Sequence, residues 1–325
     1  VGGMALVEGR WPIEVGVLVA FLLYIREFFR PLGDLSEKSN VFQAAMASCE
    51  RIFALLDEPE VIADPEQPVV VDNFNGDIEF DKVSFAYANE NWVLKNISFK
   101  IAAGQSVALV GATGAGKTSI ISLVARLYDV QRGAVKVDGY DVKAWRQSDL
   151  RSCIGVVLQD PFIFADTVAA NISLNHPDIT RDEVEEAARY VNADTFIRNL
   201  PEGYDTVLNE RGANVSTGQK QLLALARTMA QNNDILFILD EATANVDTET
   251  ESLIQNALKK VMKGRTTILI AHRLSTIRDV DRIFVMRQGE IIEEGSHLEL
   301  IEKKGYYLRL YELLSKQEQE EGVKT

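Results

Sequence analysis

The sequence contains little cysteine. Among 325 residues there are only two cysteines, Cys49 and Cys153. Two cysteines so far apart cannot form the disulfide framework that stabilises small secreted domains. We therefore expect a reduced, cytosolic environment for most of the chain.

Basic charge is also scarce. The chain has 34 Lys and Arg residues against 48 Asp and Glu residues, which gives a formal net charge of −14 and a pI near 4.8. Binding to nucleic-acid phosphates requires a clustered basic face, and the sequence contains no such cluster. A nucleic-acid partner is therefore not expected.

The N-terminal region lacks the features of a signal peptide. No basic segment and no cleavage site precede the apolar run at residues 15–25, and the chain begins at Val1. We interpret the sequence as part of a longer protein. The apolar run is shorter than the ~20 residues of a lone membrane span. Hydropathy alone therefore leaves a membrane span, an interfacial helix and a buried helix open.

A glycine-rich segment, residues 111–118, follows the apolar run 106–110 and precedes a second apolar stretch. This order of strand, glycine turn and helix is typical of a phosphate-binding loop, in which backbone N–H groups from residues 114–118 converge on phosphate oxygens. Lys117 would reach the β- and γ-phosphates, and the Thr118 hydroxyl would ligate Mg²⁺. The segment predicts a nucleoside triphosphate site, whose binding residues in this loop are Gly111, Thr113, Gly114, Ala115, Gly116, Lys117, Thr118 and Ser119.

Two carboxylates follow a second apolar run, residues 235–239. A continuous apolar run of this length is typical of a strand buried on both faces. Asp240 would hold Mg²⁺ through its water shell, and Glu241 is placed to polarise an attacking water. In isolation two carboxylates can simply end a core strand. Behind a phosphate-binding loop, the pattern favours a catalytic site.

A capping-box pattern lies between these two motifs, in residues 214–221. Ser216 and Gln219 have the spacing that fixes a helix start and directs its free N–H groups outward. A helical pattern of apolar residues follows. The segment therefore predicts a helix whose N-terminus faces a ligand.

This segment resembles the signature of ABC-type ATPases, usually Leu-Ser-Gly-Gly-Gln. Four further residues resemble motifs of that family in the expected order: Tyr87 for adenine stacking, Gln159 of the Q-loop, Asp247 of the D-loop and the switch histidine His272. Alone, Tyr87 could be a strand aromatic, Gln159 could begin a loop and His272 could be a buried strand end. Together they identify the chain as a member of the ABC family. The resemblance implies that ATP and Mg²⁺ are bound, with Gln159 also near the metal, and adds signature contacts from Ser216, Gly218 and Gln219.

The N-terminal region resembles the last transmembrane helix of ABC exporters. At ~1.5 Å per residue, a helix from about residue 13 to residue 56 would be roughly 60 Å long, twice the thickness of a hydrocarbon core. Its second half is therefore expected in water. Arg26, Glu27 and Arg30 would lie at the cytoplasmic interface or on the wall of an inward-facing cavity.

The predicted organisation has four parts. Residues 1–56 end a transmembrane domain, residues 57–75 form an acidic, proline-containing linker, residues 76–316 form the ABC ATP-binding domain, and residues 317–325 form a tail. The expected fold class is α/β: a P-loop NTPase domain with a mixed sheet, an antiparallel β layer and a helical subdomain, preceded by the long helix.

The resemblance also implies a mechanism. In this family two ATPase domains pair head to tail, and each ATP lies between one chain's phosphate loop and the other chain's signature. The implied function is ATP-driven export across the cell membrane, with the ATPase domain in the cytoplasm. Residues 206–212 resemble the segment that contacts the membrane domain in exporters. The implied partners are a second half-transporter, the lipid bilayer and a transported small molecule, lipid or peptide. The alternatives are a soluble ABC ATPase, or a P-loop kinase or GTPase, which would lack the signature helix.

One residue departs from the family pattern. The third signature position is usually glycine, and here it is Thr217. Glycine lets the backbone approach the γ-phosphate without a Cβ. We therefore expect a heterodimer with two unequal ATP sites, with a homodimer that tolerates threonine as the alternative.

Overall fold

The computed structural model describes residues 15–58, 62–71, 73–89, 91–158, 161–231, 233–240, 248–271 and 274–322. The chain divides into two compact units, residues 1–61 and residues 62–325. Each unit is described by itself.

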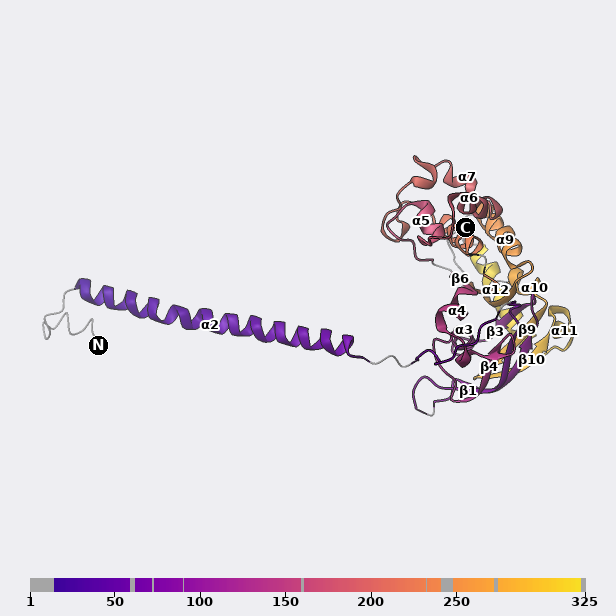
Figure 1. The fold of residues 1–325 in the computed structure, drawn as a ribbon, viewed down its shortest axis with the longest axis horizontal. Helices are drawn as coiled ribbons and strands as arrows, with labels where there is room; N and C mark the ends of the chain where they lie inside the picture. The colour runs from indigo at the N-terminus through magenta and orange to yellow at the C-terminus, as the bar shows by residue number, and fades with distance from the viewer. Residues whose placement is uncertain are drawn as a thin grey trace. The chain divides into compact units, whose positions relative to one another are not determined.

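The first unit contains one long helix, α2 (Val15–Leu56), which Figure 1 shows as continuous. Its bounds are close to the predicted 13–56, and Pro31 lies inside it. Large apolar side chains along it are exposed, among them Tyr24 at 75% and Phe28 at 73%. In the part of the chain that the structure describes, no helix is sufficiently long and apolar to cross a membrane.

The second unit is built on a six-stranded sheet with the order β10-β9-β3-β8-β7-β6. Neighbouring strands are parallel except β10, which is antiparallel to β9. The strands are β3 (Ser106–Val110), β6 (Ile154–Leu158), β7 (Ile235–Asp240), β8 (Thr266–Ala271), β9 (Arg282–Arg287) and β10 (Glu290–Gly295). The two predicted buried runs thus form β3 and β7, in the interior of the sheet.

The alternation of side chains along β3 divides the interior into two cores. Val107 and Leu109 belong to one hydrophobic cluster, whereas Ala108 and Val110 belong to the other. Successive strand residues point to opposite faces, so a strand covered on both sides must be apolar throughout. The helix α3 (Lys117–Val124) packs into the cluster that contains Val107.

A four-stranded antiparallel sheet completes that cluster. Its order is β2-β1-β4-β5, with β1 (Ile78–Phe85), β2 (Leu94–Ile101), β4 (Arg132–Val137) and β5 (Tyr140–Asp141). Phe80 of β1 stacks on Phe99 of β2 with ring centroids 4.6 Å apart. The helix α4 (Gln147–Ser152) precedes β6.

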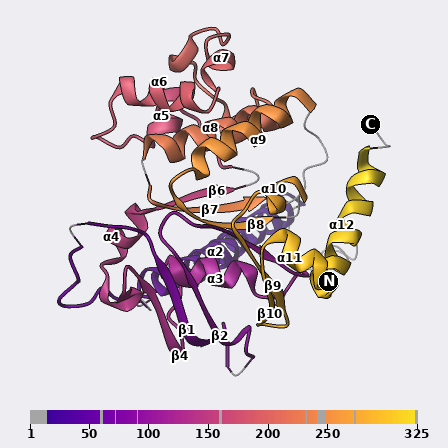
Figure 2. The ribbon, with the colours of Figure 1, turned by 90° about the vertical axis from the view of Figure 1, so that its right-hand side faces the viewer.

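The other cluster is covered by helices (Figure 2). They are α5 (Val168–Ser173), α6 (Arg181–Tyr190), α7 (Asp194–Ile197), α8 (Thr217–Ala230), α9 (Thr248–Met262), α10 (Leu274–Arg278), α11 (His297–Glu302) and α12 (Tyr306–Gly322). The mixed sheet, the antiparallel layer and the helical subdomain were all predicted. Helix α12 continues past residue 317, where a tail was predicted, because Lys, Gln and Glu are good helix formers.

Candidate nucleotide-binding site

The loop between β3 and α3 has the predicted strand, turn and helix order, and two of its glycines are required by space. A Cβ at Gly111 would lie 2.3 Å from the carbonyl oxygen of Met286 on β9. A Cβ at Gly116 would lie 2.6 Å from Leu94, and Gly116 has a φ of +102°. The loop therefore lies against β9 and β2. A larger residue at Gly111 would displace backbone, and one at Gly116 would displace the Leu94 side chain while keeping a left-handed φ.

The Lys117 ammonium is directed back onto its own loop. Lys117 is 8% exposed, and its Nζ donates to the carbonyl oxygens of Gly111 at 2.6 Å and Ala112 at 3.2 Å. The N–H of Ala115, one of the groups predicted to face phosphate, donates to the Ala112 carbonyl at 3.1 Å. Two carbonyl oxygens of the loop thus hold the Lys117 ammonium close to the loop backbone.

Tyr87 lies beside the first turn of α3. Its phenol oxygen is 2.9 Å from the Ser119 hydroxyl oxygen, and its ring meets the Tyr128 ring edge-to-face at 4.9 Å. The Tyr87 side chain is nonetheless about half exposed, at 49%. A planar, half-exposed ring next to a phosphate-binding loop provides a surface for an aromatic base. Tyr128 has no motif of its own, and the sequence analysis did not single it out.

The carboxyl ends of the parallel strands lie at one edge of the sheet. Along this edge, Leu109 pairs with Ile270, Asp240 pairs with Ala271, and Leu158 is the last residue of β6. The loops that follow neighbouring parallel strands begin at the same edge of the sheet. Ligands bind at this edge in open α/β sheets. The side chain of Asp240 and the predicted catalytic and contact residues Gln159, Glu241, Asp247 and His272 lie outside the described residues.

The predicted signature helix starts where the capping box placed it. Ser216 Oγ accepts from the Gln219 N–H at 3.2 Å, and Gln219 Oε1 accepts from the Ser216 N–H at 2.9 Å. Among the described residues, the Ser216 hydroxyl accepts in this cap and has no acceptor for its own proton. Thr217 is the first residue of α8, and Gly218 beside it is buried.

Arg227 of α8 ties the signature helix to neighbouring segments. Its guanidinium donates to the carbonyl oxygens of Asn171 at 2.9 Å and Phe162 at 3.2 Å. Burial lowers the pKa of Arg227 from its ordinary value. Phe162 lies in the segment that follows β6 and is close in sequence to Gln159. Arg227 therefore joins the signature helix α8 to the segment after β6. Sequence reasoning missed this arginine because nothing local marks its partners.

These features define the class. A parallel sheet, a glycine-rich loop cradled at the end of β3 and an ordered helix N-terminus together form a P-loop nucleotide-binding domain. Residues 94–244 match the family model described as ABC transporter. The chain therefore contains an ABC transporter ATP-binding domain, as the motifs predicted. ATP-binding proteins of this family are ATPases coupled to transport.

Curated relatives match nearly the whole chain. The uncharacterized ABC transporter ATP-binding protein YfiC of Bacillus subtilis is 47% identical over 96% of this chain and 51% of its own length. An ATP-dependent lipid A-core flippase of Syntrophus aciditrophicus is 42% identical over 98% of this chain and 52% of its own length. The chain thus spans about half the length of the curated relatives it matches.

A solved structure is similar as well. A bacterial Atm1-family ABC exporter with ATP bound matches with a TM-score of 0.74 and 40% identity. The match covers 95% of this chain and 55% of that chain. The similarity therefore includes the described helix α2 as well as the ATP-binding domain.

Proposed function

We propose that this chain is the ATP-hydrolysing end of a membrane exporter subunit. The observation that carries the proposal is the phosphate-binding loop, in which Lys117, Thr118 and Ser119 begin α3 directly behind the space-restricted Gly111 and Gly116. A relative named for multidrug export and one named as a flippase match along more than nine tenths of this chain, which supports ATP-driven transport as the function. Tyr87 stacks on the adenine, and Asp247 contacts nucleotide at the dimer interface.

Magnesium fits the oxygen ligands at this edge of the sheet. Mg²⁺ prefers oxygen donors and keeps several of its waters. The Thr118 hydroxyl, the Asp240 carboxylate and the Gln159 amide oxygen would hold it, and the ion would neutralise charge on the β- and γ-phosphates. Glu241 polarises the attacking water, and His272 contacts the γ-phosphate.

The exposed apolar surface of α2 supports its placement in a transmembrane domain. Contiguous exposed apolar side chains indicate an interaction surface, and Phe21, Tyr24 and Phe28 are all at least 60% exposed. We assign this helix to the membrane domain of the longer protein, where it packs against the other membrane helices and bilayer lipid. The subunit then resides in the cell membrane, with the ATP-binding domain in the cytoplasm and a small molecule, lipid or peptide as cargo.

We further propose that the subunit works in a heterodimer with unequal ATP sites. Thr217 places a branched side chain at the first position of α8, where the signature that completes the partner's ATP site must approach a γ-phosphate. The chain's own loop retains its glycines and Lys117. A homodimer that tolerates threonine remains the competing arrangement, because Ser216 and Gln219 still form the complete cap.

Purification of the intact transporter from its native membrane tests both proposals. The expected complex contains this subunit and one different subunit, hydrolyses ATP, and loses nucleotide binding at one site with Lys117→Ala. A complex of two identical subunits with equal turnover at both sites would contradict the heterodimer. A complex without ATPase activity would contradict the proposed function.

A further inference from the structure

A second cavity lies at the opposite end of the six-stranded sheet from the phosphate-binding loop. Its volume is about 420 Å³, within the range of small-molecule sites. Ser106, which begins β3, is part of its wall. The phosphate loop follows the other end of β3, five residues and about 16 Å away at ~3.3 Å per residue. The cavity is therefore separate from the nucleotide site.

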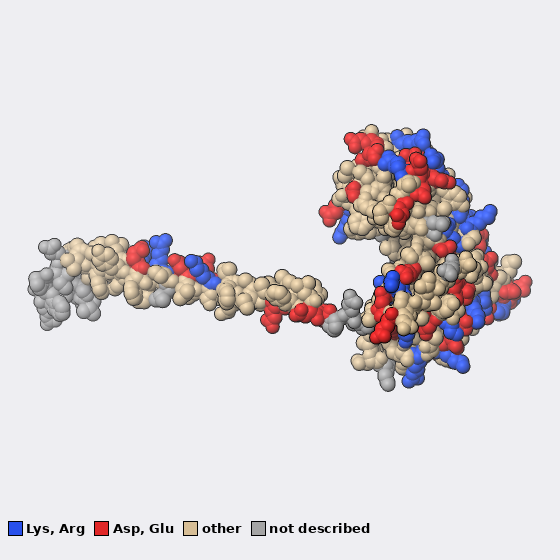
Figure 3. All heavy atoms as spheres, viewed as in Figure 1, with Lys and Arg blue, Asp and Glu red and all other residues tan. Residues whose placement is uncertain are grey.

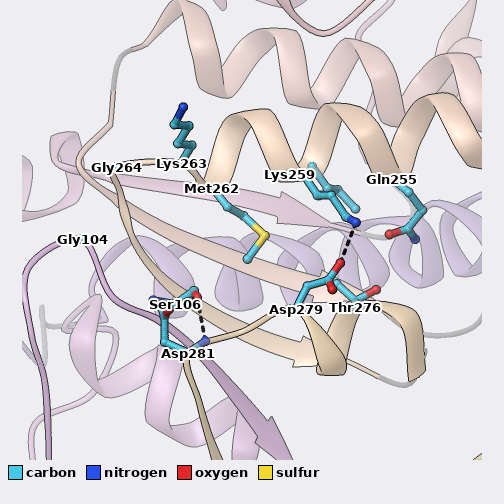
Figure 4. Close-up of a pocket in the computed structure, with 11 residues that line it drawn as sticks. Gly104, Ser106, Gln255, Lys259, Met262, Lys263, Gly264, Thr276, Asp279 and Asp281 are labelled. Carbon is cyan, nitrogen blue, oxygen red and sulfur yellow. Dashed lines mark hydrogen bonds and ion pairs between the residues drawn. The ribbon is translucent and has the colours of Figure 1, made fainter. Parts of the chain in front are cut away.

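One wall of this cavity mixes apolar side chains with Gln255, Lys259 and Lys263, and the facing wall carries two carboxylates. Leu258, which is 5% exposed, and Met262 belong to α9, while Asp279 and Asp281 follow α10. Figure 4 shows the Met262 side chain directed toward the two aspartates, whereas the Lys263 side chain points away from them. The cavity thus offers apolar contacts on the α9 side and two carboxylates opposite them.

Each carboxylate keeps one oxygen available. Asp281 Oδ2 accepts from the Ser106 N–H at 2.8 Å and from the Ser106 hydroxyl at 2.7 Å. Asp279 Oδ2 pairs with the Lys259 ammonium at 2.7 Å. Among the described residues, neither Oδ1 has a hydrogen-bond donor. The Asp281 carboxylate is also held in place by Ser106, so a ligand cation would meet a fixed acceptor.

The ion pair across the cavity is easily replaced. The side chains of Lys259 and Asp279 are 62% and 49% exposed, and ion pairs this exposed contribute little to stability. An ammonium group from a ligand can therefore take the place of Lys259 at Asp279 at small cost. Since Lys259 lies on α9 and Asp279 directly follows α10, this exchange removes a contact between two helices.

We propose that this cavity is a regulatory site for a small organic amine with an apolar body. The apolar body lies on Leu258 and Met262, and the ammonium group donates to Asp279 and Asp281. Helix α9 begins directly after Asp247, and α10 begins two residues after His272. Occupancy replaces the Lys259–Asp279 ion pair beside the two helices that follow the predicted catalytic residues in sequence, and slows hydrolysis. This last effect rests on the proposed ATPase function, whereas binding does not.

Binding is tested on the full chain with three probes that share one apolar body: 4-phenylbutylamine, 4-phenylbutan-1-ol and 4-phenylbutanoate. Isothermal titration is performed without nucleotide. The amine is expected to bind saturably, and the alcohol and the carboxylate at least about tenfold more weakly, because a hydrogen bond to a charged group is lost. Equal affinity for the three probes, or tighter binding of the carboxylate, would overturn the proposal.

Variants locate the binding. Asp279→Asn and Asp281→Asn should each weaken amine binding about tenfold, and Gln255→Trp should abolish it by filling the cavity from its partly exposed rim. Glu302→Gln, at an exposed carboxylate outside the cavity, is the matched control. Amine binding that survives Gln255→Trp and both aspartate variants would refute the site.

The regulatory effect is measured as the ATPase rate of the complete transporter with and without amine. An unchanged rate with amine bound would contradict regulation but not binding.

Discussion

The phenol oxygen of Tyr87 lies 2.9 Å from the hydroxyl oxygen of Ser119, two residues after the phosphate-loop lysine. The bond joins the residue proposed to stack on adenine to the first turn of the helix proposed to hold the phosphates. This side-chain hydrogen bond therefore fixes the Tyr87 side chain beside α3. Ser119 is 4% exposed, so its hydroxyl has few other partners available.

Tyr87→Ala should weaken ATP binding by about 1–3 kcal/mol, the range typical of base–aromatic stacking. Tyr87→Phe keeps the ring and should leave ATP affinity nearly unchanged, while lowering the free energy of unfolding by about 1 kcal/mol because Ser119 loses its partner. Ser119→Ala is the matched control for the hydroxyl bond. Titration with a fluorescent ATP analogue and urea unfolding measure the two effects. Equal losses of affinity in Tyr87→Phe and Tyr87→Ala would contradict stacking.

Gly111→Ala should destabilise the domain by about 1–3 kcal/mol, the usual cost of overpacking. The added Cβ would lie 2.3 Å from the Met286 carbonyl oxygen, and backbone must move. Gly139→Ala is the control, because Gly139 has a φ of +77° but open space around it, so only about 1 kcal/mol of backbone strain is expected. Thermal unfolding of both variants makes the comparison. A smaller loss in Gly111→Ala than in Gly139→Ala would argue against the close packing of loop and β9.

Ser216→Ala removes both the cap of α8 and the hydroxyl proposed to contact ATP across the dimer. Loss of the cap alone should cost about 1 kcal/mol. Ser296→Ala provides a matched control, because Ser296 and Glu299 form the same capping box on α11. Both variants should lose similar stability, but only Ser216→Ala should lower the ATPase rate of the assembled transporter. Similar ATPase losses in both would mean that Ser216 acts only as a cap.

Thr217→Gly should speed hydrolysis in the ATP site that this chain completes for its partner, because the backbone could approach the γ-phosphate without a Cβ. The side effect is a weaker helix start, at most about 1 kcal/mol. Thr217→Ala separates these two effects, because alanine removes the branched side chain but keeps a Cβ. Single-turnover hydrolysis in the intact complex is the measurement. Unchanged rates in both variants would show that threonine does not limit that site.

Local patterns predicted local structure well. Residues 106–124 form the expected strand, loop and helix, and Ser216 caps α8, because in both cases the determining contacts lie within a few residues. The same reasoning could not find the Tyr87–Ser119 bond or the contacts of Arg227 with Asn171, whose partners are distant in sequence.

The sequence also predicted little about the contacts and the distribution of charged side chains. The Lys117 ammonium bonds the carbonyl oxygens of Gly111 and Ala112, and these contacts depend on the folded loop and not on the motif. On the face shown in Figure 3, acidic and basic side chains are interspersed over the second unit. The net charge of −14 therefore describes the whole chain and says little about any one surface.

ATP hydrolysis by the complete transporter carrying Glu241→Gln tests the central claim most directly. The substitution keeps Lys117, Thr118 and Asp240 and removes only the group proposed to polarise the attacking water. Turnover at this chain's own site should fall by at least about 100-fold, with ATP affinity nearly unchanged and ATP retained in the closed dimer, while Glu302→Gln leaves turnover unaffected. Turnover at that site near the wild-type rate would contradict the account.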